Sequence, residues 1–269
     1  MKLESGKFLD RVPYARVGAK PDPILVLAGG QAFVQRPTRE RMERDAGRVA
    51  RLLPTGRSFL LLGYDPALPG GDSLDGIVAD IVAITREIGA PRQLVGISYG
   101  GVIALRLAAQ HPDLVSALAL LASAHDFSAE GKRRIERQID CASRGDLAAL
   151  VEGYASVFRR PWLNGLLRVR LRARRGRLSE TMNSPPTIIR GLRAILDPRL
   201  ADTTRLARVT ARTLILGGSR DQFFGDGMLE RTAAALPNAS LALFPGETHM
   251  LPVERARAVA ARLRAFLRD

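Results

Sequence analysis

The sequence has little of the chemistry that builds disulfide or metal sites. It contains one cysteine, Cys141, and three histidines, His111, His125 and His249, among 269 residues. A single cysteine excludes an internal disulfide framework and any zinc or iron–sulfur site that needs several cysteines. A histidine-rich metal site would use nearly every histidine in the chain, so we expect no metal site.

Long apolar runs are also missing. No run approaches the roughly 18 apolar residues of a transmembrane helix, and residues 1–7 hold no apolar signal core. The sequence therefore predicts a soluble, cytoplasmic protein with no membrane span. Apolar residues still make up 46% of the chain, which is enough for a sizeable core. The length predicts one large domain, or one domain with an insertion.

Lysine is scarce although the chain is strongly basic. Only four of the 41 basic residues are lysines, and the formal net charge is +14. One interpretation is a genome that favours arginine on solvated surfaces. The other is attraction to an acidic substrate, a membrane surface or nucleic acid. No nucleic-acid-binding motif is present and aromatic residues are only 5% of the chain, so we expect no nucleic acid partner.

Short apolar runs alternate with longer amphipathic stretches, which is the pattern of βα units. The runs lack strict polar alternation, as expected for strands buried on both faces. The predicted fold class is α/β, with a mostly parallel central sheet flanked by helices. Residues 1–19 can add one or two antiparallel edge strands. The predicted buried strands are 24–28, 59–62, 93–97, 117–121, 213–216 and 240–244.

Two helices are predicted with clear ends. Residues 73–88 repeat apolar side chains at helical spacing, with Ser73 able to cap the start and Gly89 at the end. Residues of about 253–267 show the same periodicity, with Glu254 at the start and arginines toward the end, which suits the helix dipole.

The βα alternation stops after residue 121 and resumes near residue 213. We therefore expect a core formed by 1–125 and 206–269, and a helical cap formed by 126–205. Residues 126–200 hold 16 basic and 8 acidic side chains, a net charge of +8. Six arginines fall within residues 168–177. They suggest either a solvated cap face or a site for an anionic substrate or surface.

The sharpest motif is Gly-x-Ser-x-Gly at 96–100, placed between a predicted strand and a predicted helix. A serine in this context lies on a tight turn that lifts the Ser98 hydroxyl clear of the sheet, at the positive end of a helix. Serine alone is a weak nucleophile and needs a base, for which His249 is the candidate. Asp221 fits the carboxylate that would orient this base. All three residues follow the carboxyl ends of strands, where open α/β sheets place their sites.

These features together resemble the α/β-hydrolase fold family, in the branch with a serine nucleophile and a helical cap. The resemblance covers nearly the whole chain and includes the loop at 65–73 (Asp-Pro-Ala-Leu-Pro-Gly-Gly-Asp-Ser). It implies an oxyanion hole formed by the backbone N–H of Tyr99 and a second N–H after the first central strand. Many relatives carry His-Gly there and this chain carries Ala28-Gly29, which leaves the second donor between Gly30 and Gln31; we favour Gly30.

Several assignments have alternatives. Asp126 follows another strand, and some relatives place the catalytic acid there; we favour Asp221. His125 is better explained by a hydrogen-bonding or substrate-lining role than by catalysis. Several large apolar side chains are predicted either to line an apolar substrate pocket or to pack between cap and core. With Gln31 and His125, the candidate pocket residues are Phe158, Trp162, Phe223, Phe224 and Met250.

The expected reaction is hydrolysis of a small ester, a lactone or a related acyl bond through an acyl-enzyme, without metal or organic cofactor. The expected partner is a small-molecule acyl substrate, and a homodimer is left open. Thioesterases and carbon–carbon bond hydrolases of the family share the triad, so they stay as alternatives. A non-hydrolytic ligand-binding protein on the same fold is the alternative from another class.

Overall fold

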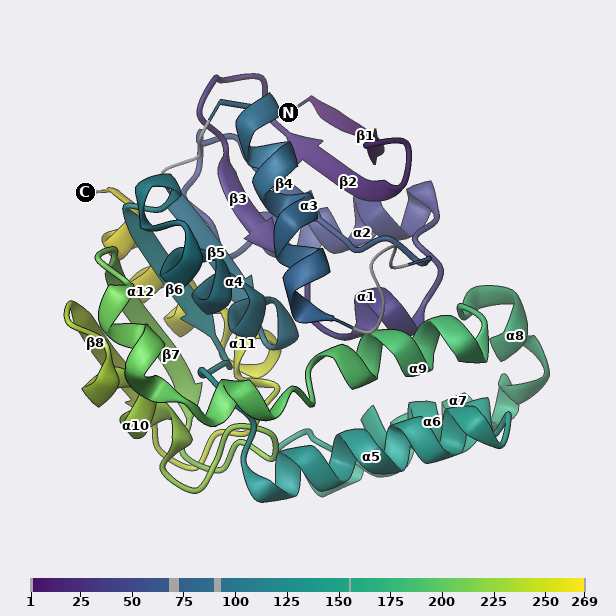
Figure 1. The fold of residues 1–269 in the computed structure, drawn as a ribbon. Coiled ribbons are helices and arrows are strands. Elements are labelled where there is room, and N and C mark those ends of the chain that lie inside the picture. Colours follow the sequence, from purple (N-terminus) through teal and green to yellow (C-terminus); the bar gives the residue numbers. More distant parts are fainter. Residues whose placement is uncertain (1, 68–72, 90–92, 155, 269) are drawn as a thin grey trace.

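The computed structural model describes residues 2–67, 73–89, 93–154 and 156–268. An eight-stranded sheet crosses the molecule in the order β1-β2-β4-β3-β5-β6-β7-β8 (Figure 1). β1 and β2 are antiparallel and the remaining pairs are parallel, so the predicted mostly parallel sheet is confirmed. The strands are β1 (Leu3–Phe8), β2 (Val12–Val17), β3 (Ile24–Leu27), β4 (Phe59–Leu62), β5 (Gln93–Ile97), β6 (Ala117–Leu121), β7 (Arg212–Gly218) and β8 (Ala239–Phe244).

The central strands are apolar on both faces because helices cover both faces. In β3, Leu25 and Leu27 belong to one buried cluster, and Ile24 and Val26 belong to another. This follows from the two-residue repeat of a strand. The first cluster lies under α3 (Leu74–Glu87), α4 (Tyr99–Gln110) and α10 (Met228–Ala235), and the second under α2 (Arg39–Ala50) and α12 (Ala256–Arg268).

The predicted helix at 73–88 is confirmed as α3. Ser73 caps its start by accepting a hydrogen bond from the Asp75 N–H, and Gly89 follows its end with a φ of +77°. The predicted helix at 253–267 is two helices, α11 (Leu251–Glu254) and α12, with a break at Arg255. Neither glycine nor proline marks this break. It coincides with the ion pair that Arg255 makes with the buried Glu247, at 3.0 Å.

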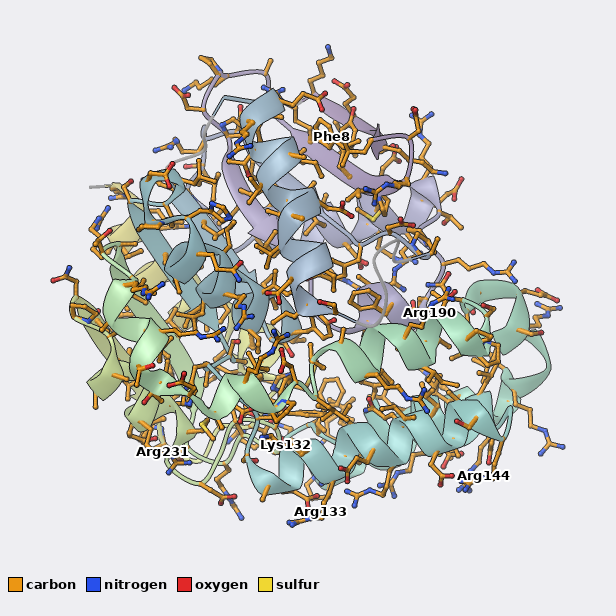
Figure 2. The ribbon with its side chains drawn as sticks, in the orientation of Figure 1. Phe8, Lys132, Arg133, Arg144, Arg190 and Arg231 are labelled. Atoms are coloured by element: carbon orange, nitrogen blue, oxygen red, sulfur yellow. The ribbon has the colours of Figure 1, made fainter. Side chains whose placement is uncertain are left out.

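Residues between β6 and β7 fold into helices, as the loss of the strand pattern predicts. Figure 1 shows them together along one side of the molecule. Arg133 and Arg144 project outward from this insertion (Figure 2). The helices are α5 (Ala129–Ser143), α6 (Leu147–Tyr154), α7 (Pro161–Ala173), α8 (Leu178–Thr181) and α9 (Pro185–Ala194), followed by the short 3-10 turns Pro198–Ala201 and Thr203–Arg208.

The insertion contacts the core through α9 and through the 3-10 turn Thr203–Arg208, which packs on α4 and α10. α9 packs on α5 and on the short helix α1 (Gln31–Val34), which follows β3. The limits of a separate cap at 126–205 stay a prediction. Across the described ranges, no helix is both long enough and apolar enough to cross a membrane.

Candidate active site

The Gly-x-Ser-x-Gly motif forms a strained turn between β5 and α4. Ser98 has a φ of +52° and a ψ of −120°, a backbone conformation that costs energy for any residue with a side chain. The flanking glycines permit the turn. A Cβ on Gly96 would collide with the Gly101 backbone, and a Cβ on Gly100 would collide with the Leu27 carbonyl. The turn therefore places the Ser98 side chain at the carboxyl end of the sheet.

His249 lies within hydrogen-bond distance of this serine. Its Nε2 is 2.9 Å from Ser98 Oγ, across 151 residues of sequence. The loop after β8 carries His249, and its backbone N–H donates to Gln222 Oε1 at 3.2 Å. The Phe223 ring packs beside the imidazole with a centroid distance of 4.7 Å. The ring is thus held between the serine and the loop that follows β7.

Asp221 meets the other nitrogen of the imidazole. His249 Nδ1 is 3.1 Å from Oδ1 and 3.0 Å from Oδ2 of Asp221. The carboxylate side chain is fully buried, and Oδ1 also accepts from the N–H groups of Phe223 at 2.8 Å and Phe224 at 3.0 Å. A carboxylate only accepts, so this geometry suits the tautomer with the proton on Nδ1, in which Nε2 can accept from the serine.

The alternative acid, Asp126, is engaged elsewhere. Its Oδ2 pairs with Lys132 Nζ at 2.6 Å, and its Oδ1 accepts from the Phe127 N–H at 2.7 Å. Within the described part of the chain, no hydrogen bond joins it to His249. The geometry therefore favours Asp221 as the partner of the imidazole.

The loop after β3 lies against the turn that carries Ser98. A Cβ on Gly29 would be 3.5 Å from Ser98 Cβ, and a Cβ on Gly30 would be 3.6 Å from the Tyr99 ring. Tyr99 and Gln31 are the first residues of α4 and α1, and first-turn N–H groups have no partner inside their helix. This arrangement suits an oxyanion hole. Gly30 as the second donor, rather than Gln31, stays a prediction.

Comparison with known proteins assigns the chain to a family. Residues 43–262 match the family model described as "Alpha/beta hydrolase family". The chain belongs to the alpha/beta hydrolase family. It is 32% identical over 197 residues to the pimeloyl-[acyl-carrier protein] methyl ester esterase of Chromobacterium violaceum, covering 70% of this chain and 72% of that protein.

Two solved structures show the same fold as this alpha/beta hydrolase. One is MGS-M2, an alpha/beta hydrolase from a Medee basin deep-sea metagenome library, with a TM-score of 0.78, 16% identity and coverage of 99% and 98% of the two chains. The other is the enol-lactonase of Burkholderia xenovorans LB400, with a TM-score of 0.76, 17% identity and coverage of 99% and 100%.

The residues expected to line a substrate pocket differ in burial. Phe223 and Phe224 are buried; Phe223 contacts the His249 ring and Phe224 packs on Phe127 at 4.6 Å. Phe158 and Met250 are half-buried, and Gln31 is exposed.

Trp162 departs from the expectation that it packs between insertion and core. Its side chain is 63% exposed, because it lies on the outward face of α7, whereas Leu163 and Leu167 on the other face are half-buried.

His125 makes a structural contact in this alpha/beta hydrolase. Its Nδ1 is 2.7 Å from the Thr232 hydroxyl, which also accepts from the His125 backbone N–H at 3.2 Å. Burial lowers the pKa of His125 below its usual value, so the imidazole is neutral near pH 7. These contacts show that His125 is hydrogen-bonded, and its place in a substrate pocket stays a prediction.

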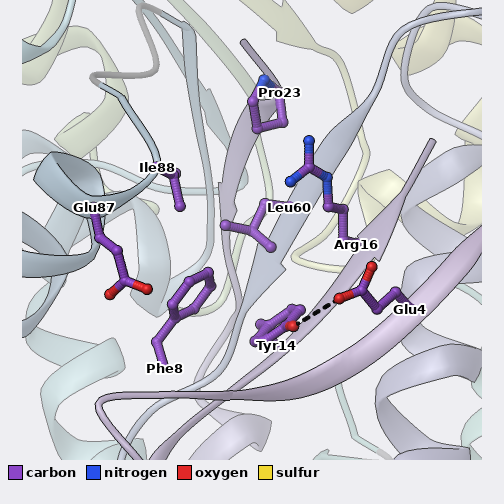
Figure 3. A pocket seen from close by; sticks show the side chains of 8 residues that line it. All are labelled: Glu4, Phe8, Tyr14, Arg16, Pro23, Leu60, Glu87 and Ile88. Carbon is purple, nitrogen blue, oxygen red and sulfur yellow. Dashed lines mark hydrogen bonds between the residues drawn. The ribbon is translucent and has the colours of Figure 1, made fainter. Parts of the chain in front are cut away.

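A cavity of about 360 Å³ lies away from these residues. Figure 3 shows its walls, which include Phe8, Tyr14, Arg16 and Glu87. Pro23, which precedes β3, also lines it, whereas Ser98 and the Gly29-Gly30 loop follow the carboxyl ends of their strands. The cavity is therefore at the opposite end of the sheet from Ser98.

The sequence reasoning missed one charged residue near the site. Glu247 is 2% exposed and pairs with Arg159 at 3.4 Å and Arg255 at 3.0 Å. The Arg159 backbone N–H also donates to Glu254 at 3.0 Å. These contacts tie the start of α7 to the loop that carries His249. A glutamate two residues before His249 gives no sequence signal of such burial.

Proposed function

We propose that this alpha/beta hydrolase cleaves a carboxylic ester through a covalent acyl-enzyme formed on Ser98. One observation carries the proposal. The Ser98 hydroxyl, the His249 imidazole and the Asp221 carboxylate form a continuous chain of contacts of 2.9 Å and 3.0 Å. A protein that only bound a ligand would have no use for a base aligned on a strained serine.

The chain of contacts supports a two-step reaction. His249 Nε2 takes the proton as Ser98 Oγ attacks the carbonyl carbon, and Asp221 stabilises the imidazolium that forms. The N–H groups of Tyr99 and Gly30 would hold the oxyanion of the tetrahedral intermediate. His249 then protonates the leaving alcohol. In the second step it activates water, which releases the acid and restores the serine.

The relative in Chromobacterium violaceum supports the substrate class. That protein is an esterase of a methyl ester, and it is matched along 72% of its length. We therefore propose an ester of a carboxylic acid with a small leaving alcohol. Small esters fit this class, and lactones undergo the same reaction with the alcohol still attached to the acyl group. Thioesters and carbon–carbon bonds are the substrates that the test must separate from both.

The test is turnover of p-nitrophenyl esters from acetyl to dodecanoyl, with wild type beside Ser98→Ala. We expect the variant to lose about 10⁴-fold or more in kcat/KM, because the nucleophile is removed. The acyl length with the highest kcat/KM would report the size of the acyl site. The kcat/KM for a matched thioester series and for a substrate with a cleavable carbon–carbon bond tests the two alternative substrate classes.

A fluorophosphonate probe covers the case of a specialised substrate. Labelling of wild type and not of Ser98→Ala shows a working nucleophile, even where no p-nitrophenyl ester is turned over. Absence of both labelling and turnover would overturn the proposal and favour a ligand-binding role.

A further inference from the structure

The outward face of α7 is apolar although it is exposed. Trp162, Leu166 and Val169 are 63%, 41% and 64% exposed. Their spacing of four and then three residues places them on one face of the helix. The described residues carry seven exposed large apolar side chains, and three of them lie on this helix. We call these three residues the α7 ridge.

The opposite face of α7 accounts for its packing. Leu163, Leu167 and Leu171 are half-buried, and Leu171 packs against the main hydrophobic cluster. The helix α7 therefore packs against the rest of the protein without using the α7 ridge. Neighbouring exposed apolar side chains mark an interaction site more often than isolated exposed ones do.

Six arginines accompany the α7 ridge: Arg168, Arg170 and Arg172 lie on α7, and Arg174, Arg175 and Arg177 follow its end. Few of them have an acidic partner. Arg172 pairs with Glu152 at 2.9 Å. Within the described ranges, no ion pair is found for the other five arginines of residues 168–177. All six are exposed. An apolar stripe with tryptophan on a helix rich in exposed arginines is the pattern of a helix that lies in the interface of a lipid bilayer.

We infer that the α7 ridge and these six arginines bind the surface of an anionic lipid bilayer. The apolar side chains would enter the boundary between headgroups and acyl chains, while the arginines contact anionic headgroups. Charge complementarity supports this occupant, because the chain has a net charge of +14. An amphipathic tryptophan is also the side chain that favours this depth of a membrane.

Docking through α7 would also orient the candidate active site. Arg159, just before α7, contacts Glu247 and Glu254 on the two sides of His249 in the sequence. The loop that carries His249 would therefore lie close to the bilayer. The binding itself does not depend on catalysis, so its test is independent of the proposed function.

Trp162 is the only tryptophan of the chain, and it reports binding directly. The experiment titrates the whole protein with vesicles of phosphatidylcholine mixed with phosphatidylglycerol, and with vesicles of phosphatidylcholine alone. With the mixed vesicles we expect a blue shift of tryptophan emission, protection from iodide, and quenching by brominated lipid chains. Binding should weaken steeply as salt is raised.

Two variants test separately the apolar side chains of the α7 ridge and the arginines that accompany it, and both keep Trp162 as the fluorescent reporter. Leu166→Gln with Val169→Gln should weaken vesicle binding by at least about tenfold. The triple variant Arg168→Gln, Arg170→Gln and Arg174→Gln should weaken vesicle binding by about 100-fold, because each arginine near an anionic surface contributes about fivefold. The matched control replaces three exposed arginines of α12, Arg257, Arg262 and Arg268, by glutamine. It should change binding by less than about threefold.

Three outcomes would overturn the inference. One is an unchanged emission spectrum with the mixed vesicles. Another is equal weakening by the α7 and α12 arginine variants, which would show attraction by net charge alone. The third is a blue shift produced by an acidic soluble protein of comparable charge and not by vesicles.

Discussion

The Tyr99 hydroxyl donates a hydrogen bond of 2.9 Å to the Gly191 carbonyl and so joins the residue after Ser98 to helix α9 of the insertion. The ring is 1% exposed and packs at 4.9 Å from Phe33 and 5.5 Å from Tyr64. One residue therefore has two separate tasks. Its backbone N–H is the proposed oxyanion donor, and its side chain bonds to the insertion.

Replacing Tyr99 by phenylalanine should separate these tasks. We expect Tyr99→Phe to lower the free energy of unfolding by about 1–3 kcal/mol, because it leaves a buried carbonyl unsatisfied. The kcat should stay within about threefold, because the backbone N–H is untouched. Urea unfolding and ester turnover measure the two effects.

Tyr64→Phe is the matched control for this prediction. The Tyr64 hydroxyl donates to the carbonyl of Ala28, at the start of the loop that would supply the second oxyanion donor. We expect a similar loss of stability and, unlike Tyr99→Phe, a fall in kcat of about tenfold from displacement of that loop. Equal kcat values for the two variants would contradict the assignment of the loop.

Asp221→Asn tests the acid of the triad. The amide can no longer hold the Nδ1–H tautomer of His249, so we expect kcat to fall by about 10⁴-fold with little change in KM. Asp126→Asn is the control, because Asp126 is also buried and charged but pairs with Lys132. The larger loss of kcat in Asp126→Asn would reverse the assignment.

The sequence predicts most strand positions because buried parallel strands are short apolar runs. The predicted limits of 59–62, 93–97 and 117–121 coincide with β4, β5 and β6. The site residues could be placed for the same reason. Each follows a strand whose carboxyl end lies at one edge of the sheet, so Ser98, Asp221 and His249 were expected to meet there.

The orientation of α7 could not be predicted in this way. Leu163 and Leu167 on one face, and Trp162, Leu166 and Val169 on the other, give the helix two apolar sides. Periodicity alone does not say which side meets the protein. The burial of Glu247 involves an ion pair with Arg159, which is distant in the sequence, so no local pattern signals it. The loop at 65–73, part of the family resemblance, lies partly outside the described residues.

Glu247 and its two partners, Arg159 and Arg255, should contribute unequally to the free energy of unfolding. Arg159 and Arg255 are 41% and 52% exposed at their side chains, whereas the Glu247 side chain is 3% exposed. Glu247→Gln leaves two arginines that water can solvate, so we expect a cost of about 1 kcal/mol. Arg159→Ala with Arg255→Ala leaves a buried carboxylate unpaired, so we expect about 3 kcal/mol or more. Urea unfolding of the two variants measures the difference, and a more costly Glu247→Gln would contradict it.

His125 should make stability depend on pH. Burial lowers the pKa of His125, Arg231 and Lys132 add to the lowering, and Asp126 opposes it. In the unfolded chain the imidazole titrates near its usual pKa of about 6.5. The unfolded state therefore binds more protons as the pH falls below that value, and the folded state loses stability. The contribution is complete above about pH 6.5 and declines toward the lowered pKa.

His125→Gln removes this titration while retaining a side chain that can bond to the Thr232 hydroxyl. The quantity to compare is the change in unfolding free energy between about pH 8 and about pH 5, not its absolute value. Other buried carboxyl groups contribute to this change in both proteins and cancel. We expect the change to be smaller in the variant than in wild type. An equal or larger change in the variant would show that His125 does not become protonated on unfolding, and would contradict the burial of a neutral imidazole.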